Sequence, residues 1–210
     1  MLRLYDFLES GNGYKVRLLL TQLGMPFEYV EREILRGETR TPNFLAKNPN
    51  GRIPLLRLED GTHLAESCAI LWYLSEGTAF APDSRVARAQ TLQWMFFEQY
   101  SHEPYIAVAR FYRHVAKLAP EQERELPRLM RRGSAALDVM ERHLSTHSYF
   151  VGERYGIADI ALYAYTHVAD EGGFSLDAYP QIRAWLARVK AQPNHISITL
   201  RPGIPVQEAA

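Results

Sequence analysis

The feature that most constrains this fold is a change in sequence pattern between residues 77 and 84. Before it, short stretches rich in strand-forming residues alternate with amphipathic helical patterns. After it, apolar residues recur at helical spacing with almost no strand signal. We therefore expect an α/β domain over residues 1–77, a linker over 78–84 and an all-α helical bundle over 85–210.

The first domain begins with an expected strand, LRLYDF at residues 2–7, followed by a glycine-containing turn and a helix. The apolar stripe of that helix runs from Val16 to Leu23, and Gly24 with Pro26 ends it. The further elements expected are strands within residues 26–32 and 52–65 and a helix over residues 66–77. The C-terminal stretch RPGIPVQEAA is expected to be an extended or loose end.

Composition limits the partners and the compartment. Lys+Arg and Asp+Glu both number 24, so the net charge is zero and no basic excess favours nucleic acid. Because the sequence contains neither an apolar run of membrane-spanning length nor a signal-peptide pattern, we expect a cytoplasmic protein with no membrane partner. The single cysteine, Cys68, excludes an intramolecular disulfide framework and is expected to be a buried structural residue.

The turn ESGNG at residues 9–13 opens a helix and therefore predicts a site for an anion. A dinucleotide fingerprint fits poorly, because Val16 stands where its third glycine belongs. A phosphate loop fits less well still, since the chain has no GKS or GKT. A helix N-terminus offers N–H groups and a partial positive charge that favour a thiolate or carboxylate, and Ser10 adds a hydroxyl.

Five segments resemble, in order, those of the soluble glutathione S-transferases: LYDFLESGNGYKVRLLLTQLGMPFEYVE, NPNGRIPLL, LAESCAILWYLSEG, YGIADIALYAY and YPQIRAWLARVKAQP. They are similar in particular to bacterial members with an N-terminal Ser-x-Asn motif, of the theta or nu type. The resemblance implies a thioredoxin-like N-terminal domain, an all-α C-terminal domain and a homodimer. It also implies a transferase that uses glutathione as co-substrate and directs its thiolate at a small apolar electrophile or a peroxide.

The resemblance implies that Ser10 is the catalytic residue, donating a hydrogen bond that stabilises the glutathione thiolate. Asn12 is the competing or assisting candidate, because an amide can also donate to the sulfur, and a purely capping role for Ser10 is the alternative. A cis bond between Ile53 and Pro54 would offer the backbone of Ile53 to the cysteinyl part of glutathione. The alternative there is a trans proline at a sheet edge.

The remaining glutathione contacts are implied at two further places. The hydroxyl of Ser67, with the N–H groups that follow it, is expected at the γ-glutamyl carboxylate, and Glu66 at the γ-glutamyl ammonium. Read without the family, these two residues indicate only the start of a helix. Arg52 and either Thr39 or Arg40 are the candidates for the glycyl carboxylate, in a loop that departs from the family's frequent histidine or lysine.

Aromatic and apolar residues are the candidates for the co-substrate pocket, with core packing as the alternative for each. They are Phe7, Leu8, Tyr105, Phe111 and Tyr112. A pocket of general apolar residues leaves three rival functions open: a non-catalytic protein that binds glutathione or apolar ligands, a glutathione-dependent isomerase, and a dehalogenase. The absence of cysteine at position 10 argues against the lyase and deglutathionylating branches of the family.

Two other patterns carry structural expectations. His143 and His147 stand four residues apart on an expected helix, but with no third ligand nearby we expect a solvated pair and no metal. Gly156 to Asp159, GIAD, resembles the family's capping box with glycine at its first position. Asp159 is expected to accept a hydrogen bond from the backbone near Gly156 and so to serve folding.

Overall fold

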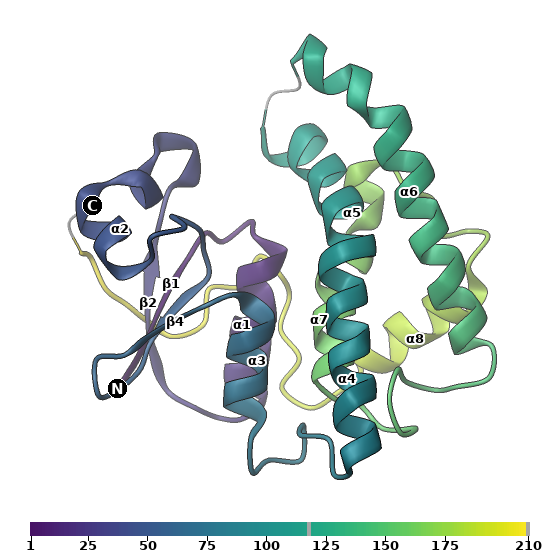
Figure 1. Ribbon diagram of the computed structural model, residues 1–210, viewed down its shortest axis with the longest axis horizontal. Helices are drawn as coiled ribbons and strands as arrows, with labels where there is room; N and C mark the ends of the chain where they lie inside the picture. The colour runs from purple at the N-terminus through teal and green to yellow at the C-terminus, as the bar shows by residue number, and fades with distance from the viewer. Residues whose placement is uncertain (117–118, 209–210) are drawn as a thin grey trace. The chain divides into compact units, whose positions relative to one another are not determined.

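The structure is a computed structural model, and it describes residues 1–116 and 119–208. Contacts between residues divide the chain into two units, which are drawn in Figure 1. The first consists of Met1–Glu76 together with the segment from Pro193 onward, and the second is Gly77–Gln192.

The first unit is built on a five-stranded mixed sheet with the strand order β4-β3-β1-β2-β5. Strands β1 and β2 are parallel, whereas β3 runs antiparallel to both β1 and β4. Helices α1 and α3 lie side by side on one face of the sheet and α2 lies on the other (Figure 1). The elements are β1 Leu2–Asp6, α1 Gly11–Gln22, β2 Phe27–Glu31, α2 Pro42–Lys47, β3 Leu55–Arg57, β4 His63–Ala65, α3 Ser67–Ser75 and β5 Ile204–Pro205.

Local sequence explains where α1 begins and ends. Ser10 has extended backbone angles and its Oγ accepts a hydrogen bond from the N–H of Gly13 at 3.2 Å, which is the geometry of an N-cap. Gly24 follows the helix with a φ of 66°, a left-handed conformation that glycine adopts readily. The predicted strand, turn and helix at the start of the chain are therefore confirmed.

Helix α2 was not among the expected elements, because its sequence is mostly polar. Thr41 caps it by accepting from the N–H of Phe44 at 3.3 Å, and Pro42 occupies the first turn, where its missing N–H costs nothing. Phe44 is buried and packs with Tyr5, Val30 and Leu55 in a core cluster of the first unit. One buried aromatic residue thus attaches a short polar helix to the sheet.

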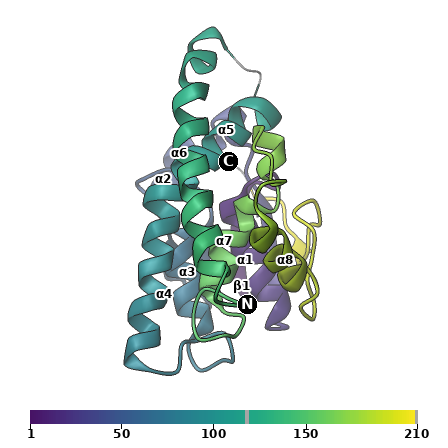
Figure 2. The ribbon, with the colours of Figure 1, turned by 90° about the vertical axis from the view of Figure 1, so that its right-hand side faces the viewer.

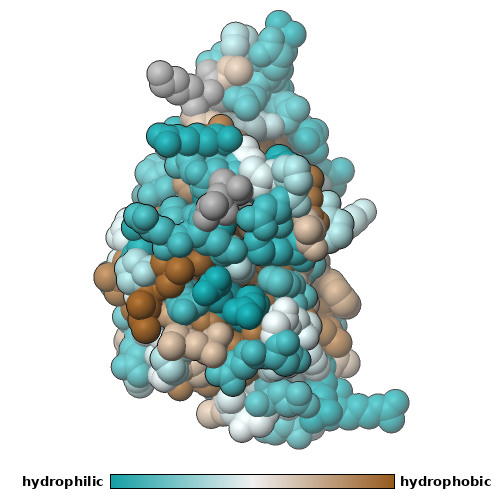
Figure 3. Space-filling view, turned by 90° about the vertical axis from the view of Figure 1, so that its left-hand side faces the viewer, coloured by the Kyte–Doolittle hydropathy of each residue, from teal (hydrophilic) through white to brown (hydrophobic). Residues whose placement is uncertain are grey.

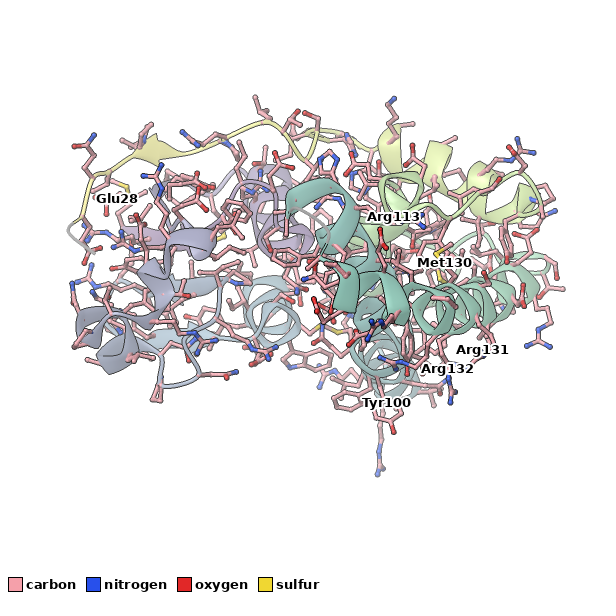
Figure 4. The ribbon with its side chains drawn as sticks, turned by 90° about the horizontal axis from the view of Figure 1, so that it is seen from above. Glu28, Tyr100, Arg113, Met130, Arg131 and Arg132 are labelled. Atoms are coloured by element: carbon pink, nitrogen blue, oxygen red, sulfur yellow. The ribbon has the colours of Figure 1, made fainter. Side chains whose placement is uncertain are left out.

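The C-terminal segment up to Glu208 is extended, which is one of the two states expected for it. Strand β5 pairs in parallel with the edge of β2, and the N–H of Val206 continues the pairing to the carbonyl of Tyr29 at 2.9 Å. Glu208 then lies 3.1 Å from the ammonium of Lys47. The segment after residue 192 therefore belongs with the sheet, and the expected division into 1–77, 78–84 and 85–210 missed this return because two-residue strands leave no periodic signal. Figure 4 labels Glu28, the β2 residue that pairs with Ile204.

The second unit is helical, as predicted, and Figure 2 shows its helices from the side. Along the longest one, buried residues recur from Leu126 to Leu144 at helical spacing, with Ala136 and Leu137 both buried at the middle of the series, which is the stripe of an amphipathic helix. Two π-helical turns, Glu98–His102 and Phe111–Val115, follow α4 and α5 within the helical stretch from Arg85 to Val115. The α-helices are α4 Arg85–Phe97, α5 Glu103–Arg110, α6 Pro120–Leu144, α7 Ile157–Thr166 and α8 Pro180–Lys190, with a 3₁₀ turn at Ala169–Gly172.

The GIAD segment behaves as expected. Oδ2 of Asp159 accepts from the N–H of Gly156 at 3.1 Å, at the start of α7. Its Oδ1 accepts from the N–H of Phe150 at 3.2 Å and from Nε1 of Trp185 at 2.9 Å. Burial raises the pKa of Asp159 to about 7, and these three donors act against that rise. This carboxyl group therefore joins the start of α7, the loop at Phe150 and helix α8.

The face drawn in Figure 3 is mainly hydrophilic, with apolar side chains in limited patches. On the second unit, the side chain of Tyr100 is 83% exposed and projects outward in Figure 4. In residues 1–116 and 119–208, the structure contains no helix with both the length and the apolar character needed to cross a membrane.

A methyl group cannot be added to Gly13 without displacing buried atoms. Its Cβ would lie 1.5 Å from Oδ1 of Asp6, a fully buried residue that is ion-paired to Arg17 at 2.9 Å. We expect Gly13→Ala to lower the free energy of unfolding by about 3 kcal/mol, measured by urea denaturation. Gly156→Ala is the matched control, because its methyl would come no nearer than 3.4 Å to the Phe80 carbonyl, and we expect a loss below about 1 kcal/mol. Equal losses would contradict this account.

Glu208 is expected to hold the C-terminal strand in a pH-dependent manner. Burial raises the pKa of Glu208, but hydrogen bonds from Tyr5 and Lys47 and the charge of Arg32 outweigh this and lower it. A carboxyl group with a lowered folded pKa contributes stability above its unfolded pKa and loses it as the pH falls through the folded pKa. We expect Glu208→Gln to reduce hydrogen-exchange protection of the Val206 amide roughly threefold at pH 7.

The same protection in the wild-type protein should decline as the pH falls through the titration of Glu208, after correction for intrinsic exchange. The Glu208→Gln variant should lack this component. If both proteins show equal protection of Val206 at pH 7, Glu208 does not hold the strand.

Candidate functional site

The strand registers bring three loops from distant parts of the sequence to one end of the sheet. Tyr5 of β1 pairs with Leu55 of β3, and Leu55 pairs in turn with Ala65 of β4. The residues just beyond these pairs are the turn before α1, the Ile53–Pro54 segment and the start of α3. A common end of the sheet therefore carries most of the predicted glutathione residues: Ser10, Asn12, Ile53, Pro54, Glu66 and Ser67.

Ser10 and Asn12 occupy the N-terminal end of α1, and both are half-buried. The first turn of α1 contains no acidic side chain, so no carboxylate of its own helix offsets the partial positive charge of this terminus. Ser10 caps the helix, as the alternative interpretation held. Because a hydroxyl that accepts one hydrogen bond can still donate another, capping leaves its proton available.

A buried lysine connects Asn12 to α3. Nζ of Lys15 lies 2.7 Å from Oδ1 of Asn12 and 3.4 Å from Oγ of Ser67, and the Ser67 hydroxyl donates to the same Asn12 oxygen at 3.2 Å. Lys15 is fully buried and Ser67 is 4% exposed. The contacts thus join the N-terminal ends of α1 and α3.

The Ile53–Pro54 peptide bond is cis, as the sequence pattern suggested. Pro54 is buried, and the half-buried side chain of Ile53 packs against the cluster formed by Tyr5, Phe44 and their neighbours. This packing fixes the backbone of Ile53 next to the sheet.

Glu66 has an unusual backbone conformation for a residue with a side chain. Its φ is 68° and its ψ is 114°, at the position that caps α3. Non-glycine residues with such angles are costly and concentrate at functional sites. The exposed side chain of Glu66 precedes the buried Ser67, so one residue points to solvent while the next joins the Asn12 contacts.

The candidates for the glycyl carboxylate lie in the loops around α2. Nη1 of Arg40 donates to the carbonyl of Asn50 at 2.9 Å, while the side chain of Arg40 remains exposed. Arg52 is also exposed, and Asn48 binds its carbonyl at 2.9 Å. Thr39 is buried, which makes the two arginines the more accessible candidates.

The co-substrate candidates are distributed over both units. Phe7 is buried and Leu8 is half-buried in the first unit. Tyr105 lies in α5, whereas Phe111 and Tyr112 begin the second π-helical turn. The Tyr112 hydroxyl donates to Glu125 at 3.1 Å. Their role as a pocket stays a prediction.

The structure corrects the expectations for the histidine pair and the cysteine. α6 ends at Leu144, so His147 lies beyond the helix. The rings of His143 and His147 are stacked, with 4.2 Å between their centroids. His143 is not fully solvated: burial first, and then His147, lowers its pKa. Cys68 is half-buried rather than buried. Among residues 1–116 and 119–208, no group of three or more His, Cys, Asp or Glu side chains could hold a metal ion.

Sequence reasoning missed Lys15 and Arg17, both fully buried in α1. A signal for Lys15 exists, because it precedes Leu19 by four residues and therefore falls on the apolar stripe of the helix. A lysine on that stripe is uncommon unless its ammonium is hydrogen-bonded. Arg17 gave no comparable signal, because its partners lie outside the helix: the carboxylate of Asp6, the carbonyl of Leu8 and two carbonyls of the C-terminal segment.

A small mixed sheet followed by a helical unit, with helix N-termini and a cis-proline gathered at one end of the sheet, defines a class of two-domain protein. The glutathione S-transferase N-terminal domain model matches residues 10–76, and the C-terminal domain model matches residues 93–193. The chain belongs to the glutathione S-transferase family. The predicted combination of a thioredoxin-like domain and an all-α domain is confirmed.

Solved structures of high sequence identity support this assignment. A glutathione S-transferase from Pseudomonas fluorescens is 56% identical, with a TM-score of 0.92, over 94% of this chain and 98% of that one. A possible glutathione S-transferase from Rhodopseudomonas palustris is 51% identical, with a TM-score of 0.93, over 97% and 92% of the two chains. The curated disulfide-bond oxidoreductase YfcG of Escherichia coli is 29% identical over 200 residues, 92% of each chain.

The positive φ of Glu66 predicts that glycine at this position stabilises the protein, whereas helix propensity alone predicts that glycine destabilises it. Glu66→Gly removes the penalty of a left-handed φ, and we expect a net gain of about 0.5–1 kcal/mol in the free energy of unfolding. Ala69→Gly, an exposed position inside the same helix, is the control and should lose about 1 kcal/mol. Thermal and urea unfolding measure both. A loss in Glu66→Gly equal to that in Ala69→Gly would show that the conformation is not strained.

Proposed function

We propose that this protein is a glutathione transferase that binds reduced glutathione at the end of the sheet and stabilises its thiolate at the N-terminus of α1. Ser10 is the proposed hydrogen-bond donor to the sulfur, with Asn12 assisting. The observation that carries the proposal is the set of contacts among Asn12, Lys15 and Ser67, which joins the starts of α1 and α3. Two helix N-termini side by side favour a ligand with separate anionic groups.

Glutathione has that chemistry, with a thiolate, a γ-glutamyl carboxylate and a glycyl carboxylate. In this proposal the thiolate lies at α1, and the γ-glutamyl carboxylate lies at the N–H groups that begin α3 with Ser67. Glu66, whose side chain is exposed, accepts from the γ-glutamyl ammonium. The backbone of Ile53 pairs with the cysteinyl part, and Arg40 and Arg52 bind the glycyl carboxylate.

The reaction needs little covalent chemistry from the protein. A hydrogen bond and a helix terminus favour the charged form of the thiol and so lower its pKa, which increases the thiolate fraction at neutral pH. The thiolate then attacks an electrophilic carbon of an apolar co-substrate to form a C–S bond while the leaving group departs with its electron pair. With a peroxide, the thiolate attacks one oxygen, so that an S–O bond forms as the O–O bond breaks and the released alkoxide or hydroxide takes up a proton. The candidates to hold that co-substrate are Phe7, Leu8, Tyr105, Phe111 and Tyr112. Catalysis comes from placement and thiolate stabilisation.

The finer classification follows from the same residues. We propose a bacterial-type member with the Ser-x-Asn motif, acting as a homodimer in the cytoplasm. Residues 10–12 read Ser-Gly-Asn, which supports the motif.

A second candidate function is reduction of glutathione-containing disulfides. It is favoured by the similarity to a protein named as a disulfide-bond oxidoreductase, which covers 92% of this chain. A serine at position 10 argues against direct attack by the protein on a disulfide, so in this case a second glutathione would supply the attacking thiolate. A non-catalytic binding protein, an isomerase or a dehalogenase would keep the same glutathione contacts.

The first experiment follows the thiolate absorbance of bound glutathione as a function of pH. A free thiol has a pKa of about 8.5, and we expect the bound thiol to ionise about 1–2 pH units lower. Ser10→Ala should raise the pKa of the bound thiol by about 1, and Asn12→Ala by a smaller amount. Turnover of an apolar electrophile and of a glutathione mixed disulfide, in parallel, separates the two candidate activities.

Failure of glutathione to bind would contradict the proposal that this protein is a glutathione transferase. Binding with an unshifted thiol would instead favour the non-catalytic protein. If Asn12→Ala has the larger effect, the donor assignment moves from Ser10 to Asn12 and the transferase proposal stands.

A further inference from the structure

We infer that Lys15 is a positioning residue that fixes the orientation of the Asn12 amide, so that Asn12 presents its N–H₂ group rather than its oxygen to the glutathione sulfur. This inference rests on the proposed function. It adds a residue that neither the motif nor the family resemblance singled out. It also bears on which of Ser10 and Asn12 acts on the thiolate.

The argument starts from what each group can do. An ammonium donates and never accepts, so the Asn12 atom that lies 2.7 Å from Nζ of Lys15 must be the carbonyl oxygen. An amide rotated by 180° would place its N–H₂ group against the ammonium. The chemistry of Lys15 therefore fixes which end of the Asn12 amide faces the ammonium.

Ser67 strengthens the same orientation. Its hydroxyl donates to the Asn12 oxygen at 3.2 Å and accepts from Lys15 at 3.4 Å, so each of the three groups contacts the other two. With Lys15 fully buried and Ser67 4% exposed, water has little access to replace these contacts. The amide nitrogen of Asn12 is consequently turned away from Lys15 and Ser67.

This orientation matters because the two ends of an amide have opposite effects on a thiolate. An N–H₂ group that donates to the sulfur stabilises the charged form and lowers the pKa of the thiol, whereas a carbonyl oxygen facing it repels the charge and raises that pKa. An amide free to rotate would present both. Lys15 therefore acts on the thiol through Asn12, without touching glutathione.

The rival explanation is a direct effect, in which the positive charge of Lys15 lowers the pKa of the thiol by itself. A double-mutant cycle distinguishes the two. If Lys15 acts through Asn12, Lys15→Met raises the pKa of bound thiol in the wild-type background but not in the Asn12→Ala background. If it acts directly, the two shifts add.

The experiment measures the pKa of bound glutathione thiol in wild type, Lys15→Met, Asn12→Ala and the double variant. We expect Lys15→Met to raise that pKa by about 1, and the double variant to match Asn12→Ala. Lys15→Gln, which keeps an N–H donor without the charge, should show less than half the effect and replaces Lys15→Met if the latter does not fold. Lys190→Met, at an exposed lysine of α8, is the control and should cause no shift.

A second measurement does not depend on glutathione. The side-chain amide signals of Asn12 in a ¹⁵N-labelled protein are identified by their loss in Asn12→Ala. In Lys15→Met they should move or broaden as the amide gains a second orientation, and in Lys190→Met they should stay unchanged. Additive pKa shifts, or an Asn12 signal indifferent to Lys15→Met, would overturn the role of Lys15. A wild-type protein that leaves the thiol unshifted, with the Asn12 signal still responding to Lys15→Met, would instead overturn the proposed function.

Discussion

The buried ion pair between Asp6 and Arg17 is the interaction on which the first unit depends. Both side chains are fully buried, with Nε of Arg17 2.9 Å from Oδ2 of Asp6. Burial raises the pKa of Asp6, whereas the Arg17 charge and the N–H of Phe7 oppose that rise. Removing one partner of such a pair leaves an uncompensated buried charge, at a cost of about 3–5 kcal/mol. The pair therefore fixes α1 on the end of β1, and with it the direction of the helix terminus.

The same guanidinium connects the candidate site to the end of the chain. Nη2 of Arg17 donates to the carbonyl of Leu8 at 2.6 Å, and Nη1 donates to the carbonyl of Leu200 at 2.8 Å. Glu31 makes a parallel link, because it accepts from the N–H of Leu8 at 2.9 Å and from Arg201 at 2.7 Å. The turn before α1 is thus held by groups that also hold the C-terminal segment. That segment is part of the framework of the site, although it is nearly the whole chain away in sequence.

Sequence patterns predicted elements wherever the periodic signal and the burial come from the same residues, as in α1, α3 and the helices of the second unit. They failed where the stabilising contact is remote. β5 has two exposed residues and is a strand because it pairs with the edge of β2, so no local sequence pattern predicts it. α2 is stabilised by one buried residue, Phe44, in an otherwise polar stretch. The same holds for the candidate site. Motifs identified Asn12 and Ser67, but no local sequence pattern indicated the hydrogen bond between their side chains.

α1 carries two buried cationic side chains, and each contacts a different part of the first unit. Arg17 fixes the helix to the sheet through Asp6, and Lys15 fixes Asn12 against α3 through Ser67. Both lie in the N-terminal half of the helix. The carboxylate of Asp6 offsets the charge of Arg17, whereas the positive charge of Lys15 adds to the partial charge that the backbone places at that end. A serine or asparagine donor at this terminus therefore acts in a field that already favours an anion. In the proposed function, this field acts together with the hydrogen bond from a hydroxyl or amide to stabilise the thiolate.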